Sequence, residues 1–197
     1  MRLIPYPGGK DQLVSIQAKY LPREGFDKVW ETCAGTAAMT INLFAGLGLK
    51  EMIVTELELG MASLLKQVQE NPMEFLNAIM QTEYTLEEYD WAEEQEDNNF
   101  EGLSQLEIAC VRYIKSFMSP NGMGKDYRDI DQGADDDIEC FISGKRWRSK
   151  YKRQMLPSIM GYYQLLNGVK IIHGDMFDYY DSMIGDAGRL IYADVPY

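Results

Sequence analysis

Histidine and cysteine are too scarce in this sequence for a zinc site or a disulfide framework. One histidine, His173, accompanies three widely separated cysteines, Cys33, Cys110 and Cys140. This set does not contain the ligand spacing of zinc sites or the paired cysteines of small secreted domains. Long apolar runs are also missing, since no window approaches the roughly 20 apolar residues that cross a bilayer, and the N-terminus lacks the apolar core of a secretion signal. We therefore expect a cytoplasmic protein with no metal and no membrane partner.

Basic residues are also few compared with acidic residues. The chain has 19 Lys and Arg against 31 Asp and Glu, a formal net charge of −12, whereas DNA binding depends largely on basic residues that neutralise phosphates. Residues 145–153 depart from this balance, because the segment contains Trp147 and Tyr151 among basic residues and has no acid. Such a cluster is typical of a phosphate-binding surface. A solvated helix face, whose long side chains cover apolar surface, remains the alternative. The basic residues that we expect to contact DNA are Lys145, Arg146, Arg148 and Lys150.

The remaining composition is that of a globular α/β protein. With 197 residues and 46% hydrophobic residues, the chain can bury the core of one domain. A strand-like run at 26–30 ends in Glu31 and is followed by a turn of small residues and a helical pattern. A second strand-like run at 52–55 ends in Glu56, and apolar residues then recur at helical spacing. Two β-α units in series predict a parallel sheet.

The pattern changes near residue 84 and changes back near residue 168. An acidic run at 87–97 and a helical pattern at 103–117 lead into a loop at 118–145 that is rich in glycine and acids. Strand-like runs return at 169–172 and 189–193. We therefore predict a core made of residues 1–84 and 168–197, interrupted by a mostly helical lobe at 85–167. The acidic run is expected to be a solvated helix face.

Two acids that end successive strands indicate a nucleoside site. The stretch Ala34 to Ala38 follows Glu31, and its small residues let a nucleotide-like ligand approach the backbone at the carboxyl edge of a parallel sheet. Gly35 is the only glycine of that turn, so the G-x-G-x-x-G fingerprint of dinucleotide-binding proteins is absent. Glu56 stands where a carboxylate can accept hydrogen bonds from both ribose hydroxyls. A structural turn and two solvated acids remain the alternative.

The final residues carry the groups that methylation of an amine needs. Asp194, Val195, Pro196 and Tyr197 follow the last strand-like run. The exocyclic amine of adenine is a poor nucleophile, so a site must accept its N–H bonds and orient its lone pair. Asp194 and the carbonyl of Val195 are candidate acceptors, and the ring of Tyr197 is a candidate platform for a base turned out of the duplex. Taken alone, this tetrapeptide is equally consistent with a turn after a strand.

Together these motifs resemble the Dam-like family of adenine-specific DNA methyltransferases, whose catalytic motif is Asp-Pro-Pro-Tyr. The similar segments occur in the family's order along nearly the whole chain, and six motifs in one order are more specific than any one of them. Residues 6–10 resemble the opening motif, in which Tyr6 and Lys10 border the cofactor, and 31–42 and 56–58 resemble the glycine-containing motif and the acidic motif that follows it. Residues 117–125, with Asn121 and Lys125, resemble a segment of the recognition region. Residues 174–177, with Asp175, resemble the segment at the cofactor adenine, and 194–197 resemble the catalytic motif.

The resemblance implies a Rossmann-like, S-adenosylmethionine-dependent methyltransferase fold and transfer of a methyl group to the N6 amine of adenine in double-stranded DNA, in a bacterial or phage enzyme. It implies that Glu56 holds the cofactor ribose, that Glu31 lies near the methionine end, and that Asp194 serves both the cofactor and the target amine. Two alternatives stay open. One is a catalytically inactive remnant that keeps the cofactor or DNA site, and the other is a methyltransferase for RNA or another amine.

Three departures from the family pattern carry their own expectations. Val195 replaces the first proline of the catalytic motif, so the carboxylate of Asp194 is less firmly aimed. Ala37 replaces a glycine, and its Cβ should crowd the cofactor unless its φ is negative. The family continues beyond its catalytic motif with strands that complete the sheet, whereas this sequence ends at Tyr197. We therefore expect an incomplete sheet and poor or absent turnover by this chain even if it binds cofactor.

Overall fold

The computed structural model describes residues 3–4, 13–22, 24–119 and 144–194, and in the last helix before β3 it describes side chains from Met155 onward. Four parallel strands form one sheet in the order β3-β2-β1-β4. They are β1 (Lys28–Thr32), β2 (Glu51–Glu56), β3 (Val169–His173) and β4 (Arg189–Ala193). The predicted α/β class with a parallel sheet, resumed after a long interruption, is confirmed. All described elements between β2 and β3 are helices.

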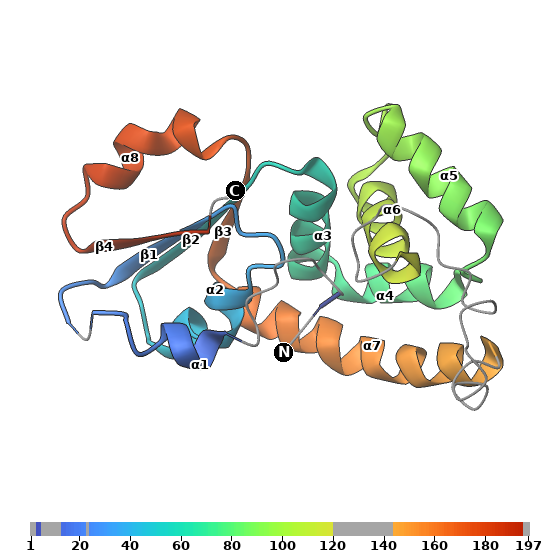
Figure 1. Ribbon diagram of the computed structural model, residues 1–197, viewed down its shortest axis with the longest axis horizontal. Coiled ribbons are helices and arrows are strands. Elements are labelled where there is room, and N and C mark those ends of the chain that lie inside the picture. The colour runs from blue at the N-terminus through green and yellow to red at the C-terminus, as the bar shows by residue number, and fades with distance from the viewer. Residues whose placement is uncertain (1–2, 5–12, 23, 120–143, 195–197) are drawn as a thin grey trace.

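Helices flank this sheet and extend well beyond one side of it (Figure 1). Short helices α1 (Val14–Gln17), α2 (Ala38–Asn42), the 3-10 helices η2 (Phe44–Gly46) and η5 (Met176–Tyr179), and α8 (Tyr180–Ile184) belong to the region around the sheet. The longer helices are α3 (Leu59–Glu70), α4 (Pro72–Gln81), α5 (Leu86–Asp97), α6 (Gln105–Met118) and α7 (Gly144–Leu166).

Successive side chains of a strand point to opposite faces of the sheet, so the core is divided between the two faces. Val29 packs with Met39 of α2 and Phe44 of η2 on one face. Trp30, its neighbour in β1, packs on the other face with Met183 of α8 and with β2. Figure 1 accordingly shows α2 and α8 on opposite sides of the sheet. Glu31 lies on the α2 face, because it is two residues from Val29.

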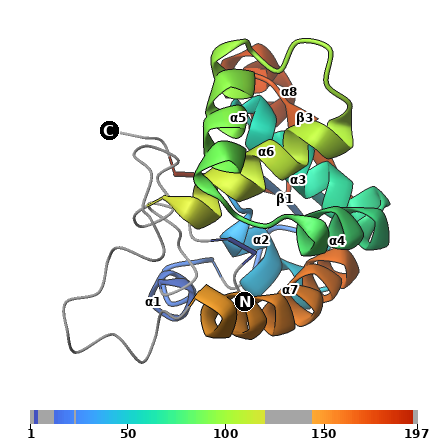
Figure 2. The same ribbon diagram turned by 90° about the vertical axis from the view of Figure 1, so that its right-hand side faces the viewer.

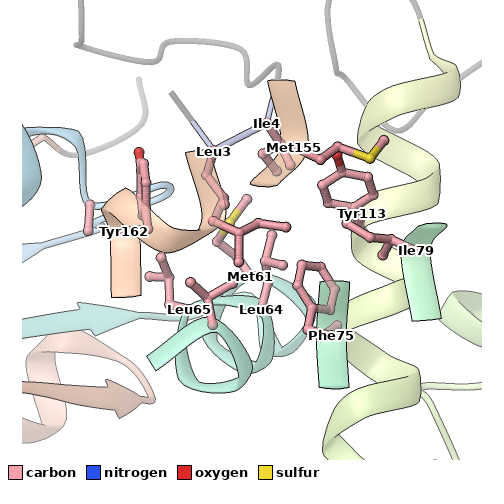
Figure 3. Packing of buried hydrophobic residues seen from close by; sticks show 14 of the residues in the cluster. Leu3, Ile4, Met61, Leu64, Leu65, Phe75, Ile79, Tyr113, Met155 and Tyr162 are labelled. Carbon is pink, nitrogen blue, oxygen red and sulfur yellow. The ribbon is translucent and has the colours of Figure 1, made fainter. Parts of the chain in front are cut away.

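The largest apolar cluster lies where the longer helices meet (Figure 3). Buried side chains of α3, including Met61 and Leu64, meet Phe75 of α4, Tyr113 of α6 and Tyr162 of α7. Figure 2 shows α7 beneath α2 and α4. The core therefore runs without interruption across residue 84, where the sequence changes pattern, and the division of the chain into two domains stays a prediction.

Strand and helix ends differ slightly from those expected. The predicted strand at 26–30 is β1 at Lys28–Thr32, so Glu31 lies within the strand instead of after it. The reason is pairing, since Glu31 stands opposite Val54 of β2 and Tyr192 of β4. The helix expected at 103–117 begins later, because Ser104 caps α6 through a reciprocal bond pattern with Glu107.

Candidate functional site

The order of the strands locates the candidate site at the carboxyl edge of the sheet. In the sheet, β2 and β3 lie on one side of β1, and β4, which comes later in the chain, lies on the other side. The junction between β1 and β4 is thus a topological switch point, where open α/β sheets bind ligands beyond the carboxyl ends of their strands. Glu31, Glu56, Asp175 and Asp194 lie within two residues of these ends, and Glu58 follows Glu56 at the end of β2.

The turn after β1 has an unusual backbone. Cys33, Gly35 and Ala37 all have left-handed conformations, with φ of 51°, 52° and 53°. Only glycine adopts this region without strain, so the two other residues store backbone strain next to the switch point. The φ of Ala37 is therefore positive, and the condition under which its Cβ would stay clear of a cofactor is not met. Ala37 is fully buried.

Glu31 is a buried carboxylate at the beginning of α2. Its side chain accepts hydrogen bonds from the backbone N–H of Thr40 (2.7 Å) and of Met39 (3.4 Å), and the residue is 3% exposed. These bonds satisfy donors that the first turn of a helix leaves unpaired. Burial raises the pKa of Glu31 to about 7, with a further upward contribution from the charge of Asp194, while the bonds from α2 oppose the shift.

Glu56 joins the turns that follow β1 and β2. Its Oε2 accepts the N–H of Gly35 (2.6 Å), and its Oε1 accepts the N–H of Glu58 (2.9 Å). The carboxylate is buried, but each of its oxygens has a second lone pair. Two backbone donors therefore fix the orientation of the group and leave acceptor capacity for ligand hydroxyls.

The two remaining acids differ in burial. Asp175 is exposed and accepts the N–H of Phe177 (3.0 Å), and the N–H of Gly174 donates to the carbonyl of Glu56 (3.0 Å). Asp194 is half-buried directly after β4, and its charge raises the pKa of both Glu31 and Cys33, for which burial is the larger cause. The structure thus brings Asp194 near Glu31 and brings the Asp175 segment near Glu56.

Two large apolar side chains at this edge are open to solvent. Leu57 follows Glu56 and is 64% exposed, and Phe177 follows the Asp175 turn and is 68% exposed. Both lie next to chain segments that are joined by the Gly174 to Glu56 hydrogen bond. Apolar side chains in these positions suit contact with the faces of a flat ring.

The structure also reveals a buried cation that sequence reasoning did not identify. Nε of Arg112, in α6, lies 2.6 Å from Oε1 of Glu58, and the Arg112 side chain is 6% exposed. Burial raises the pKa of Glu58, while Arg112 opposes the shift. One turn along α6, Lys115 is paired with Glu96 and lies 4.0 Å from Glu93. Two acids of α5 are therefore partners of a buried lysine and not only parts of a solvated face. Basic residues three apart within an apolar helix face were the available signal.

Several predicted site residues lie outside the described residues. They are Tyr6, Lys10, Asn121, Lys125, Val195, Pro196 and Tyr197. The four basic residues of the proposed DNA contact, Lys145, Arg146, Arg148 and Lys150, belong to the first turns of α7, and their side chains likewise lie outside the described part of the chain.

Comparison with models of known protein families finds no match to this chain, and comparison with curated protein sequences finds none either. Among the described residues there is no group of His, Cys, Asp and Glu side chains arranged to hold a metal ion. No helix in the described part of the chain is long and apolar enough to cross a membrane.

Proposed function

We propose that this chain is an S-adenosylmethionine-dependent methyltransferase of the Rossmann-like type that acts on the N6 amine of adenine in DNA. The observation that carries the proposal is the set of acids around the switch point of the sheet. Glu31, Glu56, Asp175 and Asp194 come from all four strand ends, and the first two are oriented by backbone amides at the turns. Their order along the chain is that of the motifs that resemble the Dam-like family.

The proposal assigns the cofactor to the carboxyl edge. Glu56 would accept hydrogen bonds from the ribose hydroxyls with its remaining lone pairs, and Leu57, Phe177 and Asp175 would hold the adenine. Glu31 lies toward the methionine end. Support comes from the hydrogen bonds of Glu56 to Gly35 and Glu58, because a carboxylate already held by two donors needs little reorganisation to bind a ligand.

The cofactor supplies a methyl group made electrophilic by the sulfonium to which it is bonded. The chain's part in the reaction is to orient the nucleophile. Asp194 and the carbonyl of Val195 accept the N–H bonds of the target amine, so that its lone pair points at the methyl carbon, and Tyr197 stacks on the base. As the new N–C bond forms, the bond between the methyl carbon and sulfur would break, S-adenosylhomocysteine would leave, and one amine proton would pass to water. The half-buried position of Asp194 beside Glu31 supports this assignment.

The basic residues in the first turns of α7 would allow a protein with a net charge of −12 to bind DNA. Replacing Lys145, Arg146, Arg148 and Lys150 together by Gln should flatten the dependence of log affinity for duplex DNA on log salt, by about 0.9 for each phosphate that is no longer neutralised. An unchanged slope would show that this segment is surface only. Lys170, an exposed lysine of β3, provides the control as Lys170→Gln.

The direct test is transfer of a labelled methyl group from S-adenosylmethionine to duplex DNA, run beside the same assay with RNA. In keeping with the poor turnover expected from the sequence, we expect only slow formation of N6-methyladenine in DNA, abolished by Asp194→Ala and unaffected by Glu87→Gln, which changes an exposed acid on α5. Methylation of RNA alone would contradict the assigned substrate. Tight binding of the cofactor with no transfer to either polymer would favour the non-catalytic alternative.

A further inference from the structure

Arg112, in α6, forms an ion pair with the segment that follows β2. Its Nε contacts Oε1 of Glu58 at 2.6 Å, and its aliphatic carbons occupy the space beside Gly60, where an added Cβ would stand 3.2 Å from Cβ and Cδ of Arg112. The guanidinium group is thus held between α6 and the first turn of α3. A residue larger than glycine at position 60 would require these carbons to move by a few tenths of an ångström.

A short series of contacts leads from Arg112 to the candidate ribose carboxylate. Arg112 holds the side chain of Glu58, the backbone N–H of Glu58 donates to Oε1 of Glu56, and Oε2 of Glu56 accepts the N–H of Gly35. Glu58 is the residue that precedes α3, and its side chain makes no capping bond to that helix. The ion pair with Arg112 is therefore what anchors this side chain at the sheet edge.

We propose that Arg112 is a positioning residue that gives the site its selectivity for ribose hydroxyls. The inference rests on the proposed function, in which Glu56 binds those hydroxyls. A binding constellation must be held within about half an ångström by its supporting residues, and Arg112 restrains the turn that supplies one of the two donors to Glu56. Without the guanidinium, Glu58 becomes free to move, and the carboxylate of Glu56 loses its fixed direction.

Lys115 provides a matched control on the same helix. It is as deeply buried as Arg112, with side-chain exposures of 5% and 6%, but its ion-pair partners are Glu96 and Glu93 of α5, and it lowers the pKa of Glu58 less than Arg112 does. Loss of either cation removes an ion pair whose basic member is buried and whose acids are 34–48% exposed, and it lowers stability. Only loss of Arg112 should change the ratio between the affinities for a ligand with ribose hydroxyls and for one without them.

The experiment compares two probes by calorimetry, S-adenosylhomocysteine and its analogue without the 2′ and 3′ hydroxyls. The wild-type chain should bind the parent compound about tenfold or more tightly, which is the range for hydrogen bonds to a charged group. In Arg112→Met this ratio should fall below about threefold, and Arg112→Lys should restore part of it. Lys115→Met should keep the wild-type ratio even where its absolute affinity or its melting temperature falls.

The outcomes separate this inference from the proposed function. A wild-type chain that does not distinguish the two probes contradicts both, because Glu56 then binds no hydroxyls. A wild-type chain that distinguishes them, with the same ratio in folded Arg112→Met, overturns only the role of Arg112. If Arg112→Met does not fold, Glu58→Ala removes the contact from its more exposed side, and an unchanged ratio in that variant overturns the inference.

Discussion

At the amino edge of the sheet acidic side chains pair with basic side chains, whereas at the carboxyl edge Glu31, Glu56 and Asp175 accept hydrogen bonds from backbone N–H groups. Lys28 contacts Asp186 at 2.8 Å, Arg189 contacts Glu51 at 2.6 Å, and Lys50 contacts Asp27 at 2.6 Å. A hydrogen bond from Lys28 lowers the pKa of Asp186, and one from Lys50 lowers that of Asp27. At the other edge, burial raises the pKa of Glu31.

The difference separates structural charge from charge available to a ligand. Ion pairs at the amino edge neutralise both partners, so little is gained there by binding another group. Backbone donors orient a carboxylate without cancelling its full charge, and they leave lone pairs unused. Glu31 and Glu56 are therefore prepared for hydroxyls or a cation, while Glu51 and Asp186 stabilise the fold.

The largest expected effect concerns the pH dependence of stability. The pKa of Glu31 is raised from 4.5 to about 7 in the folded chain, so the folded state binds this proton more tightly than the unfolded state. Stability should therefore fall as pH rises from 4.5 to about 7, by about 3 kcal/mol from this group. Glu31→Gln should remove that part of the decrease. Urea unfolding at several pH values measures the difference between the two proteins, in which the other carboxyl groups cancel. Equal decreases in both would contradict the burial of an ionising Glu31.

Replacing Glu56 should change ligand affinity rather than fold class. Glu56→Ala removes the acceptor of the Gly35 and Glu58 amides and of the proposed ribose hydroxyls. We expect binding of S-adenosylhomocysteine to weaken by about 1–3 kcal/mol. Calorimetry with circular dichroism as a check on folding measures this. Wild-type affinity in the folded variant would place the ribose contact elsewhere.

The strained turn allows a smaller and more specific prediction. In Ala37→Gly, relief of the left-handed conformation offsets the reduced methyl burial and the added chain entropy, so stability should stay within about 0.5 kcal/mol of the wild type. Ala38, the next residue, is also buried but begins α2. Ala38→Gly should therefore cost about 1–2 kcal/mol. Equal losses in the two variants, measured by urea unfolding, would argue against the positive φ at Ala37.

The smallest expected effect is at the amino edge. Arg189→Met breaks the contacts to Glu51 and Asp186. It should lower stability by less than the pH-dependent change assigned to Glu31, and part of the difference from wild type should disappear in high salt, because the acids of these ion pairs are 42% and 26% exposed and screening weakens ion pairs that solvent reaches. Affinity for S-adenosylhomocysteine should not change. A large loss of affinity in folded Arg189→Met would show that the two edges are not independent.

The sequence was sufficient to predict the parallel sheet and the acids at its carboxyl edge, because strand periodicity and strand-end acids are local patterns. It was not sufficient for the backbone of the turn, since Cys33 and Ala37 have no residue-type signal for a positive φ. The Arg112 to Glu58 contact was also missed. It joins positions far apart in the chain, and only the packing of α6 against α3 brings them together.

The structural surroundings of Glu31 and Glu56 were predicted only in part. Their location at strand ends followed from the order of the motifs, whereas the bonds that hold them depend on how α2 and the Gly35 turn are oriented. A sequence does not reveal whether the partners of a strand-end acid will be backbone amides or basic side chains. The type of partner distinguishes Glu31 and Glu56 at the carboxyl edge from the paired acids at the amino edge.

The central claim is that the carboxyl edge binds S-adenosylmethionine, and calorimetric titration of the chain with this compound and with S-adenosylhomocysteine tests it most directly. The account predicts saturable binding of both, weakened in Glu56→Ala and retained in Arg189→Met. The absence of both heat and thermal stabilisation at millimolar ligand would contradict it.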